Sequence, residues 1–398
     1  MDEIKVLIGW DDAAEAETIE LILNVNGMAA VIATDAEDFR AKAGAGGWDV
    51  LVMSLSFPTH ENAFPLFESL MADESKATII GAWHQGDIVH LAKFISAGLY
   101  SHLMRDEEGS FIMLLRSMIE AAMAGVQAQR ARLLAERLRE EVDSVRRLQE
   151  NVIPQNLPEP SGYAIAARYE PSQIRLLGSN PVAMAGGDYY DVFQMDASNL
   201  ILLVGDASGH GVKACMSIMT MHTLIRMIRS SQFSNTADFV AEINRSLSAN
   251  QIVHDEGGFI TLLYSTLDVA KHRLAWTSAG APIPLLQNLK TNEIKLVGED
   301  DDGGLPLAID EDWEYQSKFI DIPEHSRLLI YTDGLDEAFP QNGNEDTQFG
   351  LDGIINSLKN TVNLTVEQAL QKLFDDSNNF TQGAGRTDDT SVVLLERK

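Results

Sequence analysis

Four aspartates stand in four short, separated motifs in the C-terminal part of the chain. They are Asp188 in GGDYYD, Asp206 in GDASGHG, Asp333 in YTDGLDEA and Asp388 in RTDDTSVV. Each motif lies beside a stretch that reads as a β-strand, and no cluster of Cys or His competes with the carboxylates. Carboxylate oxygens are the ligands that hard cations prefer. The set therefore predicts a cation site of the kind that hydrolyses phosphate esters with two metal ions.

Strand geometry limits which of these carboxylates can converge. Side chains alternate between the two faces of a strand, so Asp188 and Asp191 point to opposite sides of a regular strand. We expect Asp188 to be the ligand, because Gly186 and Gly187 allow a close approach of backbone and ions. Each aspartate taken singly is explained as well by a turn or a helix cap. Only the combination favours a metal site.

Composition narrows the class of protein. At 398 residues with 45% hydrophobic residues, the chain is long enough for two or three ordinary globular domains. A net charge of -29 argues against nucleic acid and anionic membranes as partners, and it suits divalent cations. A single cysteine, Cys215, excludes an internal disulfide and fits a reducing cytoplasm. The acidic N-terminus is unlike a secretion signal, and no apolar run is expected to reach the ~18 residues of a membrane span.

The first ~120 residues alternate strand-like and helix-like segments. Apolar strands are expected at Lys5–Trp10, Met28–Thr34, Asp49–Leu55, Ala77–Trp83 and Leu99–Met104, each followed by a helical segment. Five βα units predict a doubly wound parallel sheet of five strands with helices on both faces. We assign residues 1–122 to this domain.

A long helix is predicted to follow over residues 123–153, because no Gly or Pro interrupts it after Gly125. An apolar stripe runs near heptad spacing, with Glu141 breaking it. The stripe consists of Ala131, Leu134, Leu138, Val145, Leu148 and Val152. A helical coiled coil that makes a homodimer is our first interpretation, and a single helix packed on one domain is the alternative. Pro154 marks the end of the helix and the start of the last domain, 154–398.

The C-terminal domain carries many strands and few helices. Strands are expected at Tyr163–Tyr169, Asp188–Met195, Leu200–Val204, Phe259–Asp268, Arg273–Ser278, Pro284–Leu289, Tyr315–Ile320, Arg327–Tyr331 and Ser391–Leu395. Helices are expected at Lys213–Ser230, Thr236–Gln251 and Thr365–Asn378. This pattern predicts a two-sheet β-sandwich flanked by helices, so the whole chain is α/β followed by α+β.

The last 245 or so residues resemble the SpoIIE/RsbU-like branch of bacterial metal-dependent Ser/Thr protein phosphatases, in the protein phosphatase 2C superfamily. Besides the four aspartate motifs, the matching stretches are LQENVIPQNLP, ARYEPS, FITLLYSTLD, SAGAPIP and GLPLAI. The resemblance implies two ions, Mn²⁺ or Mg²⁺. Asp188, Asp206 and the carbonyl of Ala207 would hold one ion, and Asp206, Asp333 and Asp388 the other, with Asp206 bridging and central to catalysis.

Three features depart from that family. The connector from Tyr169 to Gly186 is long, Ala281 stands where the family commonly has His, and no Arg lies just upstream of Asp188 to bind phosphate. The general acid is therefore open, and His210 is the nearest candidate, against a plain loop residue. The GGD string also recurs in diguanylate cyclases, but an acidic residue and Phe follow the aspartate there, and here two tyrosines follow.

The first domain resembles a response-regulator receiver that has lost its phosphotransfer residues. Asp11 and Asp12 match the receiver's acidic pair. Ser54 stands at the phosphoacceptor position, Trp83 near the place of the small hydroxyl residue, and Arg105 at the place of the lysine. A serine cannot form the acyl phosphate, so we interpret residues 1–122 as a pseudo-receiver.

Taken together, the sequence predicts a cytoplasmic phosphoserine/phosphothreonine protein phosphatase controlled by this domain. By resemblance, its substrate would be a phosphorylated anti-sigma-factor antagonist, a STAS-domain protein, in a partner-switching pathway. The alternative is a catalytically silent module that sequesters the same partner. A silent module is expected to lose a metal aspartate, and all four are present.

Overall fold

The chain folds into two compact units, residues 1–137 and 138–398. The computed structural model describes residues 3–398 except 73–77, 107, 175–181, 184–185, 229–232, 255–256, 341–346, 383–385 and 387. The division between the units falls inside a single long helix, α5 (Phe111–Val152). The predicted boundaries at 122 and 153 stay a prediction.

The N-terminal unit is a five-stranded parallel sheet in the order β2-β1-β3-β4-β5. Its strands are β1 (Ile4–Gly9), β2 (Met28–Ile32), β3 (Val50–Ser54), β4 (Thr78–His84) and β5 (Ser101–Arg105). Its other helices are α1 (Ala13–Val25), α2 (Ala36–Gly44), α3 (Ala63–Met71) and α4 (Ile88–Ser96). Residues of α1 and α5 pack on one face of the sheet, and residues of α2, α3 and α4 pack on the other. This is the predicted doubly wound, receiver-like fold.

Helix α5 begins as a core helix of this unit. Phe111, Ile112, Leu115 and Ile119 are buried at the spacing of one helical face. An 18-residue stretch of α5, with mean hydropathy 1.3, is long and apolar enough to cross a membrane by length and composition. The expectation that no such run exists was therefore wrong, although the apolar residues named here pack on the sheet.

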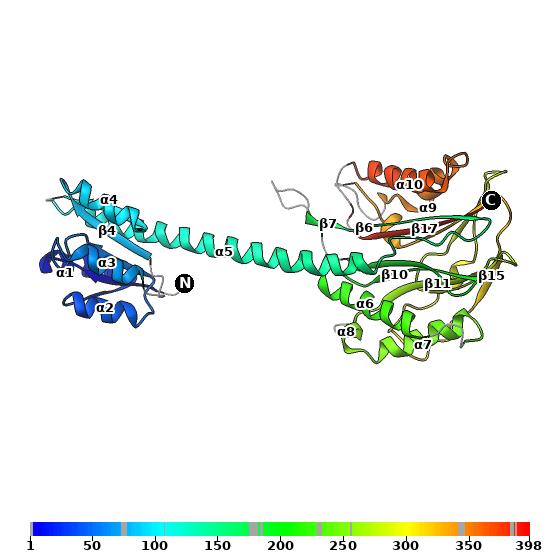
Figure 1. Ribbon diagram of the computed structural model, residues 1–398, viewed down its shortest axis with the longest axis horizontal. Helices are drawn as coiled ribbons and strands as arrows, with labels where there is room; N and C mark the ends of the chain where they lie inside the picture. Colours follow the sequence, from blue (N-terminus) through cyan, green and yellow to red (C-terminus); the bar gives the residue numbers. More distant parts are fainter. Residues whose placement is uncertain are drawn as a thin grey trace. The chain divides into compact units, whose positions relative to one another are not determined.

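The C-terminal unit contains two antiparallel five-stranded sheets (Figure 1). The first has the order β15-β12-β11-β10-β9, with β15 (Lys318–Asp321), β12 (Arg273–Ala279), β11 (Ile260–Asp268), β10 (Asn199–Ala207) and β9 (Asp188–Gln194). The second has the order β14-β13-β16-β17-β6, with β14 (Ile294–Leu296), β13 (Leu285–Asn288), β16 (Ser326–Tyr331), β17 (Thr390–Arg397) and β6 (Tyr163–Glu170). Two short strands, β7 (Gln173–Ile174) and β8 (Val182–Ala183), pair within the connector that precedes β9. Residues 175–181 and 184–185 of that long connector lie outside the described residues.

Alternation along the strands creates the layers. In β16, Leu328 and Ile330 join the core between the sheets, whereas Leu329 and Tyr331 join a second core beneath the outer helices. Helices α9 (Gly350–Lys359) and α10 (Val366–Phe380) cover this second sheet. Helices α6 (Val212–Met227), α7 (Thr236–Ser248) and α8 (Gln251–His254) contribute to the core around the first sheet. The predicted sandwich flanked by helices is confirmed.

One strand prediction was partly wrong, and some elements were missed. The segment predicted as a strand from Tyr315 forms β15 only from Lys318 onward, and helix α9 and strand β14 were not predicted. Gly350, with a positive φ of 61°, stands at the first position of α9, where sequence patterns more often indicate the end of a helix.

Candidate metal centre

Asp188 and Asp206 lie directly opposite each other on neighbouring strands. The antiparallel register of β9 and β10 pairs Asp206 with Asp188, and facing side chains in such a pair lie on the same side of the sheet. Sequence analysis placed Asp206 after its strand, but β10 continues through Ala207. The backbone N–H of Ala207 donates to the carbonyl of Gly187 at 2.9 Å, so the ladder runs to the end of β9.

Asp333 and Asp388 come from the second sheet. Asp333 begins the short 3-10 turn η4 (Asp333–Leu335), which follows β16, and Asp388 lies just before β17. Thr332, between β16 and η4, connects the sheets, because its hydroxyl donates to Asp188 Oδ2 at 2.6 Å. The same hydroxyl accepts from the backbone N–H of Ser391 at 2.8 Å. Strand ends from both sheets therefore place the four predicted aspartates in one region.

The carboxylates of this region disturb one another electrostatically. Burial, followed by the charge of Asp206, raises the pKa of Asp188 well above its usual range. Burial and then the charges of Asp333 and Asp388 raise the pKa of Asp206 to about 8. The pKa of Asp388 is raised to about 6, chiefly by burial, and that of Asp333 is raised by burial and by Glu337. Buried like charges destabilise the ionised state unless protons or cations neutralise them.

The donor set fits a hard cation. Asp333 Oδ1 is buried and has no hydrogen-bond partner among the described residues. A Cβ on Gly187 would lie 2.6 Å from the carbonyl oxygen of Ala207 and 3.0 Å from Asp206 Oδ1. Only glycine at this position therefore avoids crowding these two oxygens. No three His, Cys, Asp or Glu side chains of the described residues lie in a ready-made metal-binding group. The predicted ligand set of Asp188, Asp206, Ala207, Asp333 and Asp388 stays a prediction.

Asp389 is a buried carboxylate of this region that sequence analysis missed. It accepts from the backbone N–H of Gly187 at 2.5 Å and from that of Ser172 at 2.6 Å, so it fixes the turn before Asp188. Burial raises the pKa of Asp389, while these backbone donors act in the opposite direction. The doubled aspartate in RTDDTSVV was the available signal.

Gln149, near the end of α5, contacts the same turn. Its side-chain amide donates to the carbonyl of Asp188 at 3.0 Å and accepts from the backbone N–H of Gly186 at 2.8 Å. Gln149 is fully buried, and the neighbouring Val152 packs against the core of the sandwich. The final turn of α5 is therefore part of the support for β9.

The two remaining candidates are placed differently. His210 is exposed in the loop between β10 and α6, and its charge lowers the pKa of Asp388, in opposition to burial. Asp191 is buried away from the four aspartates, where Tyr189 donates to it at 2.6 Å and Arg226 pairs with it at 2.5 Å. This agrees with the expectation that Asp188 and Asp191 face opposite sides.

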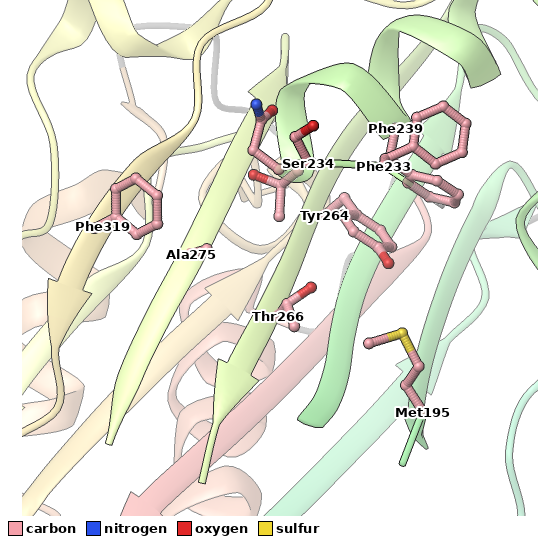
Figure 2. A pocket seen from close by; sticks show the side chains of 10 residues that line it. Met195, Phe233, Ser234, Phe239, Tyr264, Thr266, Ala275 and Phe319 are labelled. Atoms are coloured by element: carbon pink, nitrogen blue, oxygen red, sulfur yellow. The ribbon is translucent and has the colours of Figure 1, made fainter. Parts of the chain in front are cut away.

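A separate cavity of about 220 Å³ lies against the first sheet beside the start of α7 (Figure 2). Four aromatic side chains line it, and its polar lining comes from the segment at 234–236 and from Thr266. The aromatic lining residues are Phe233, Phe239, Tyr264 and Phe319. None of the candidate metal aspartates lines this cavity.

In the N-terminal unit, a buried guanidinium lies among residues that matched the receiver pattern. Arg105 is buried and bonds Asp11 at 2.6 Å, Glu15 at 2.5 Å and the hydroxyl of Ser54 at 2.9 Å. Burial opposes ionisation of Asp11, but Ser54 and Arg105 together lower its pKa. Asp12, predicted as the second acid of the pair, instead caps α1 by accepting from the backbone of Ala14 and Glu15.

The sandwich of two antiparallel sheets flanked by helices has the fold of protein phosphatase 2C-type domains. The family described as stage II sporulation protein E (SpoIIE) matches residues 196–398, just over half of the chain. The chain belongs to this SpoIIE family. The matched region includes Asp206, Asp333 and Asp388 but begins after Asp188.

Individual relatives are more distant. The chain is 28% identical over 157 residues to phosphoserine phosphatase RsbP of Bacillus subtilis, covering 39% of this chain and 38% of RsbP. It is 22% identical over 257 residues to phosphoserine phosphatase RsbU of the same organism, covering 65% of this chain and 71% of RsbU. The solved SiaA-PP2C domain of Pseudomonas aeruginosa aligns with a TM-score of 0.51 at 16% identity, covering 67% of this chain and 99% of that domain. This last likeness supports the fold alone.

Proposed function

We propose that this chain is a metal-dependent phosphoserine/phosphothreonine protein phosphatase. The convergence of Asp188, Asp206, Asp333 and Asp388 from two sheets carries the proposal. All four carboxyl groups are raised in pKa, chiefly by burial, and neighbouring carboxylates add to the effect. Such a cluster is stable in its ionised form when cations neutralise it. Membership of the SpoIIE family and the names of RsbP and RsbU support the reaction type.

Asp188, Asp206, Asp333, Asp388 and the carbonyl of Ala207 would hold two Mn²⁺ or Mg²⁺ ions. When bound, two such ions acidify a water molecule and neutralise the phosphoryl oxygens. The residues of this chain provide orientation: Thr332 and Gln149 fix Asp188, and Asp389 fixes the turn before it. His210, exposed beside Asp388, is the candidate to protonate the leaving serine or threonine oxygen.

The proposed substrate is a phosphorylated STAS-domain protein, an anti-sigma-factor antagonist of a partner-switching pathway. This proposal extends to the chain what the resemblance to RsbU-like phosphatases implies. The exposed His210 loop is a surface that a folded protein substrate can reach. A catalytically silent sequestering module is the alternative, and the presence of all four aspartates argues against it.

A cytoplasmic homodimer is the proposed assembly. Leu134 and Leu138 of α5 are 59% and 58% exposed, and Leu148 is also exposed, so the apolar stripe has few partners within the chain. Pairing two stripes in a coiled coil over residues 123–153 would bury it. Because Gln149 of the same helix holds the turn before Asp188, a rearrangement of α5 would reach the candidate ligands directly.

The deciding experiment is a phosphatase assay on candidate STAS proteins from the same genome, phosphorylated on serine or threonine. Release of phosphate that requires Mn²⁺ or Mg²⁺ and disappears in Asp206→Asn supports the proposal. Tight binding of the phosphoprotein without turnover at any metal concentration supports the sequestering module instead.

A further inference from the structure

Arg386, a buried arginine, lies shortly before strand β17, which begins at Thr390. Its side chain is 3% exposed. Nε donates to Glu170 at 3.0 Å, and the guanidinium stacks 4.9 Å from the ring centre of Phe374. Glu170 ends β6, so Arg386 is anchored to the second sheet and to α10.

The other side of the guanidinium bonds the two segments that contain Asp333 and Asp388. Nη1 donates to the carbonyl of Gly334 at 3.3 Å and to the hydroxyl of Thr390 at 3.1 Å. Gly334 directly follows Asp333, and Thr390 lies two residues after Asp388. These are the two predicted ligands that the second sheet provides.

The same two loops are in tight backbone contact. A Cβ on Gly334 would lie 1.8 Å from the carbonyl oxygen of Asp389, which no side chain can tolerate. Glycine therefore lets the loops touch, and Arg386 bonds one atom on each side of the contact. A planar guanidinium can make several directed bonds at once, whereas an ammonium is a single point charge.

We propose that Arg386 is a positioning residue that holds the Asp333 and Asp388 loops in the geometry that binds the metal ions. The inference rests on the proposed metal-dependent function and deepens it. Arg386 is too deeply buried to contact the phosphate of a protein substrate, so its role is distinct from substrate binding. Outer residues that orient metal ligands typically change metal affinity by about 10- to 100-fold when they are replaced.

If charge alone mattered, replacing Arg386 would strengthen Mn²⁺ binding rather than weaken it. Removing a positive charge close to a cation site strengthens the attraction between the carboxylates and a divalent ion. The full-length Arg386→Met chain removes the charge and the bonds, and Arg386→Lys keeps the charge but cannot reproduce the fork. A positioning role predicts that both variants bind Mn²⁺ at least about tenfold more weakly than the wild type.

Arg168 offers a matched control. It pairs with the same Glu170 and stacks on the same Phe374, at 4.6 Å. Among the described residues its remaining hydrogen bond goes to Gln371 and not to a metal loop. Arg168→Met should leave the Mn²⁺ affinity within about twofold of the wild type. Loss of affinity in this control equal to that in Arg386→Met would attribute the effect to the second sheet as a whole and overturn the proposal.

The measurement is a titration of metal-free, full-length protein with Mn²⁺. The paramagnetic resonance signal of the free ion reports how much Mn²⁺ remains unbound. Circular dichroism in metal-free buffer checks the fold, and phosphatase activity against Mn²⁺ concentration separates affinity from turnover. The expected result is weaker binding in both Arg386 variants, with activity largely recovered at saturating Mn²⁺. If Arg386→Met does not fold, Arg386→Lys and Thr390→Val decide, because both should also weaken binding.

Wild-type affinity in folded Arg386→Lys and Thr390→Val, or tighter binding in Arg386→Met, would overturn the positioning role and leave the proposed function intact. Failure of the wild-type chain itself to bind Mn²⁺ would overturn the metal-dependent function, and the role of Arg386 with it. The two failures are therefore distinguishable.

Discussion

Thr332→Val tests a residue that positions a predicted metal ligand without being a ligand itself. The Thr332 hydroxyl donates to Asp188 Oδ2 at 2.6 Å and accepts from the Ser391 N–H at 2.8 Å. All three residues are buried. Valine has nearly the shape of threonine, so the replacement removes both hydrogen bonds without opening a cavity.

The expected cost follows from the two lost bonds. Leaving the buried N–H of Ser391 unpaired costs about 1–3 kcal/mol, and a typical hydrogen bond contributes about 0.5–1.5 kcal/mol. Because the two terms are not independent, we expect a loss of about 2–4 kcal/mol in the free energy of unfolding. The hydroxyl also lowers the pKa of Asp188 against the effects of burial and Asp206. Without it the proton is held more tightly, so Mn²⁺ should bind about tenfold more weakly.

The assay is denaturant unfolding of the metal-free chain together with direct Mn²⁺ titration. Thr223→Val is the matched control, since its hydroxyl donates only to the exposed helix carbonyl of Met219. We expect the control to change the unfolding free energy by less than about 0.5 kcal/mol. A Thr332→Val protein with wild-type stability and wild-type Mn²⁺ affinity would refute the role assigned to this hydroxyl.

Three further predictions concern the candidate ligands, the N-terminal unit and the assembly. Asp206→Asn should abolish Mn²⁺-dependent hydrolysis of p-nitrophenyl phosphate, whereas Asp191→Asn should lose stability but keep most activity at saturating Mn²⁺; full activity in Asp206→Asn would contradict the ligand set. Incubation with acetyl phosphate and Mg²⁺ should add no aspartyl phosphate to the N-terminal unit, because Ser54 holds the acceptor position; a stoichiometric, base-labile mass increase would contradict this. Replacing Leu138 and Val145 with Glu should convert dimers to monomers by light scattering, and a wild-type monomer at tens of micromolar would refute the coiled coil.

Strong local patterns in the sequence were sufficient to predict the fold. The five βα units and most strands of the sandwich follow from apolar runs and alternation, and the structure has them within a few residues. The exceptions have physical causes. Lys318–Asp321 forms the edge strand β15 although the apolar pattern begins at Tyr315, because pairing with β12 determines where that strand starts. Helix α9 follows a segment outside the described residues, and its amphipathic pattern is only ten residues long.

The sequence identified the acidic motifs but not what supports them. The motif YTDGLDEA pointed to Asp333, yet nothing in it distinguished Thr332 as the partner of Asp188, 144 positions away in the chain. Gln149 lies in the stretch LQENVIPQNLP that resembled the family, but no role was assigned to it, and its contacts with Gly186 and Asp188 depend on tertiary packing. Side chains that orient a site act through contacts between distant segments, so spacing within one motif cannot reveal them.

Asp12 matched the receiver pattern in sequence, but in the structure its side chain caps helix α1. The adjacent pair Asp11 and Asp12 matched the receiver pattern, but an aspartate just before a helix is also a favoured N-cap. The cap interaction determines the position of Asp12, and Glu15, in the first turn of α1, is the second acidic side chain that bonds Arg105.

The two acidic clusters of the chain differ in how their charge is neutralised. In the N-terminal unit, Arg105 supplies a fixed cation to Asp11 and Glu15, and the pKa of Asp11 is lowered as a result. In the C-terminal unit, Arg386 is paired with Glu170. Burial and then the charge of Asp206 raise the pKa of Asp188, and burial and then the charges of Asp333 and Asp388 raise the pKa of Asp206. An acidic cluster with an internal guanidinium has no need of a metal ion, whereas one without it favours protons or external cations. By this criterion the first unit carries its own cation, and the proposed metal chemistry belongs to the second unit.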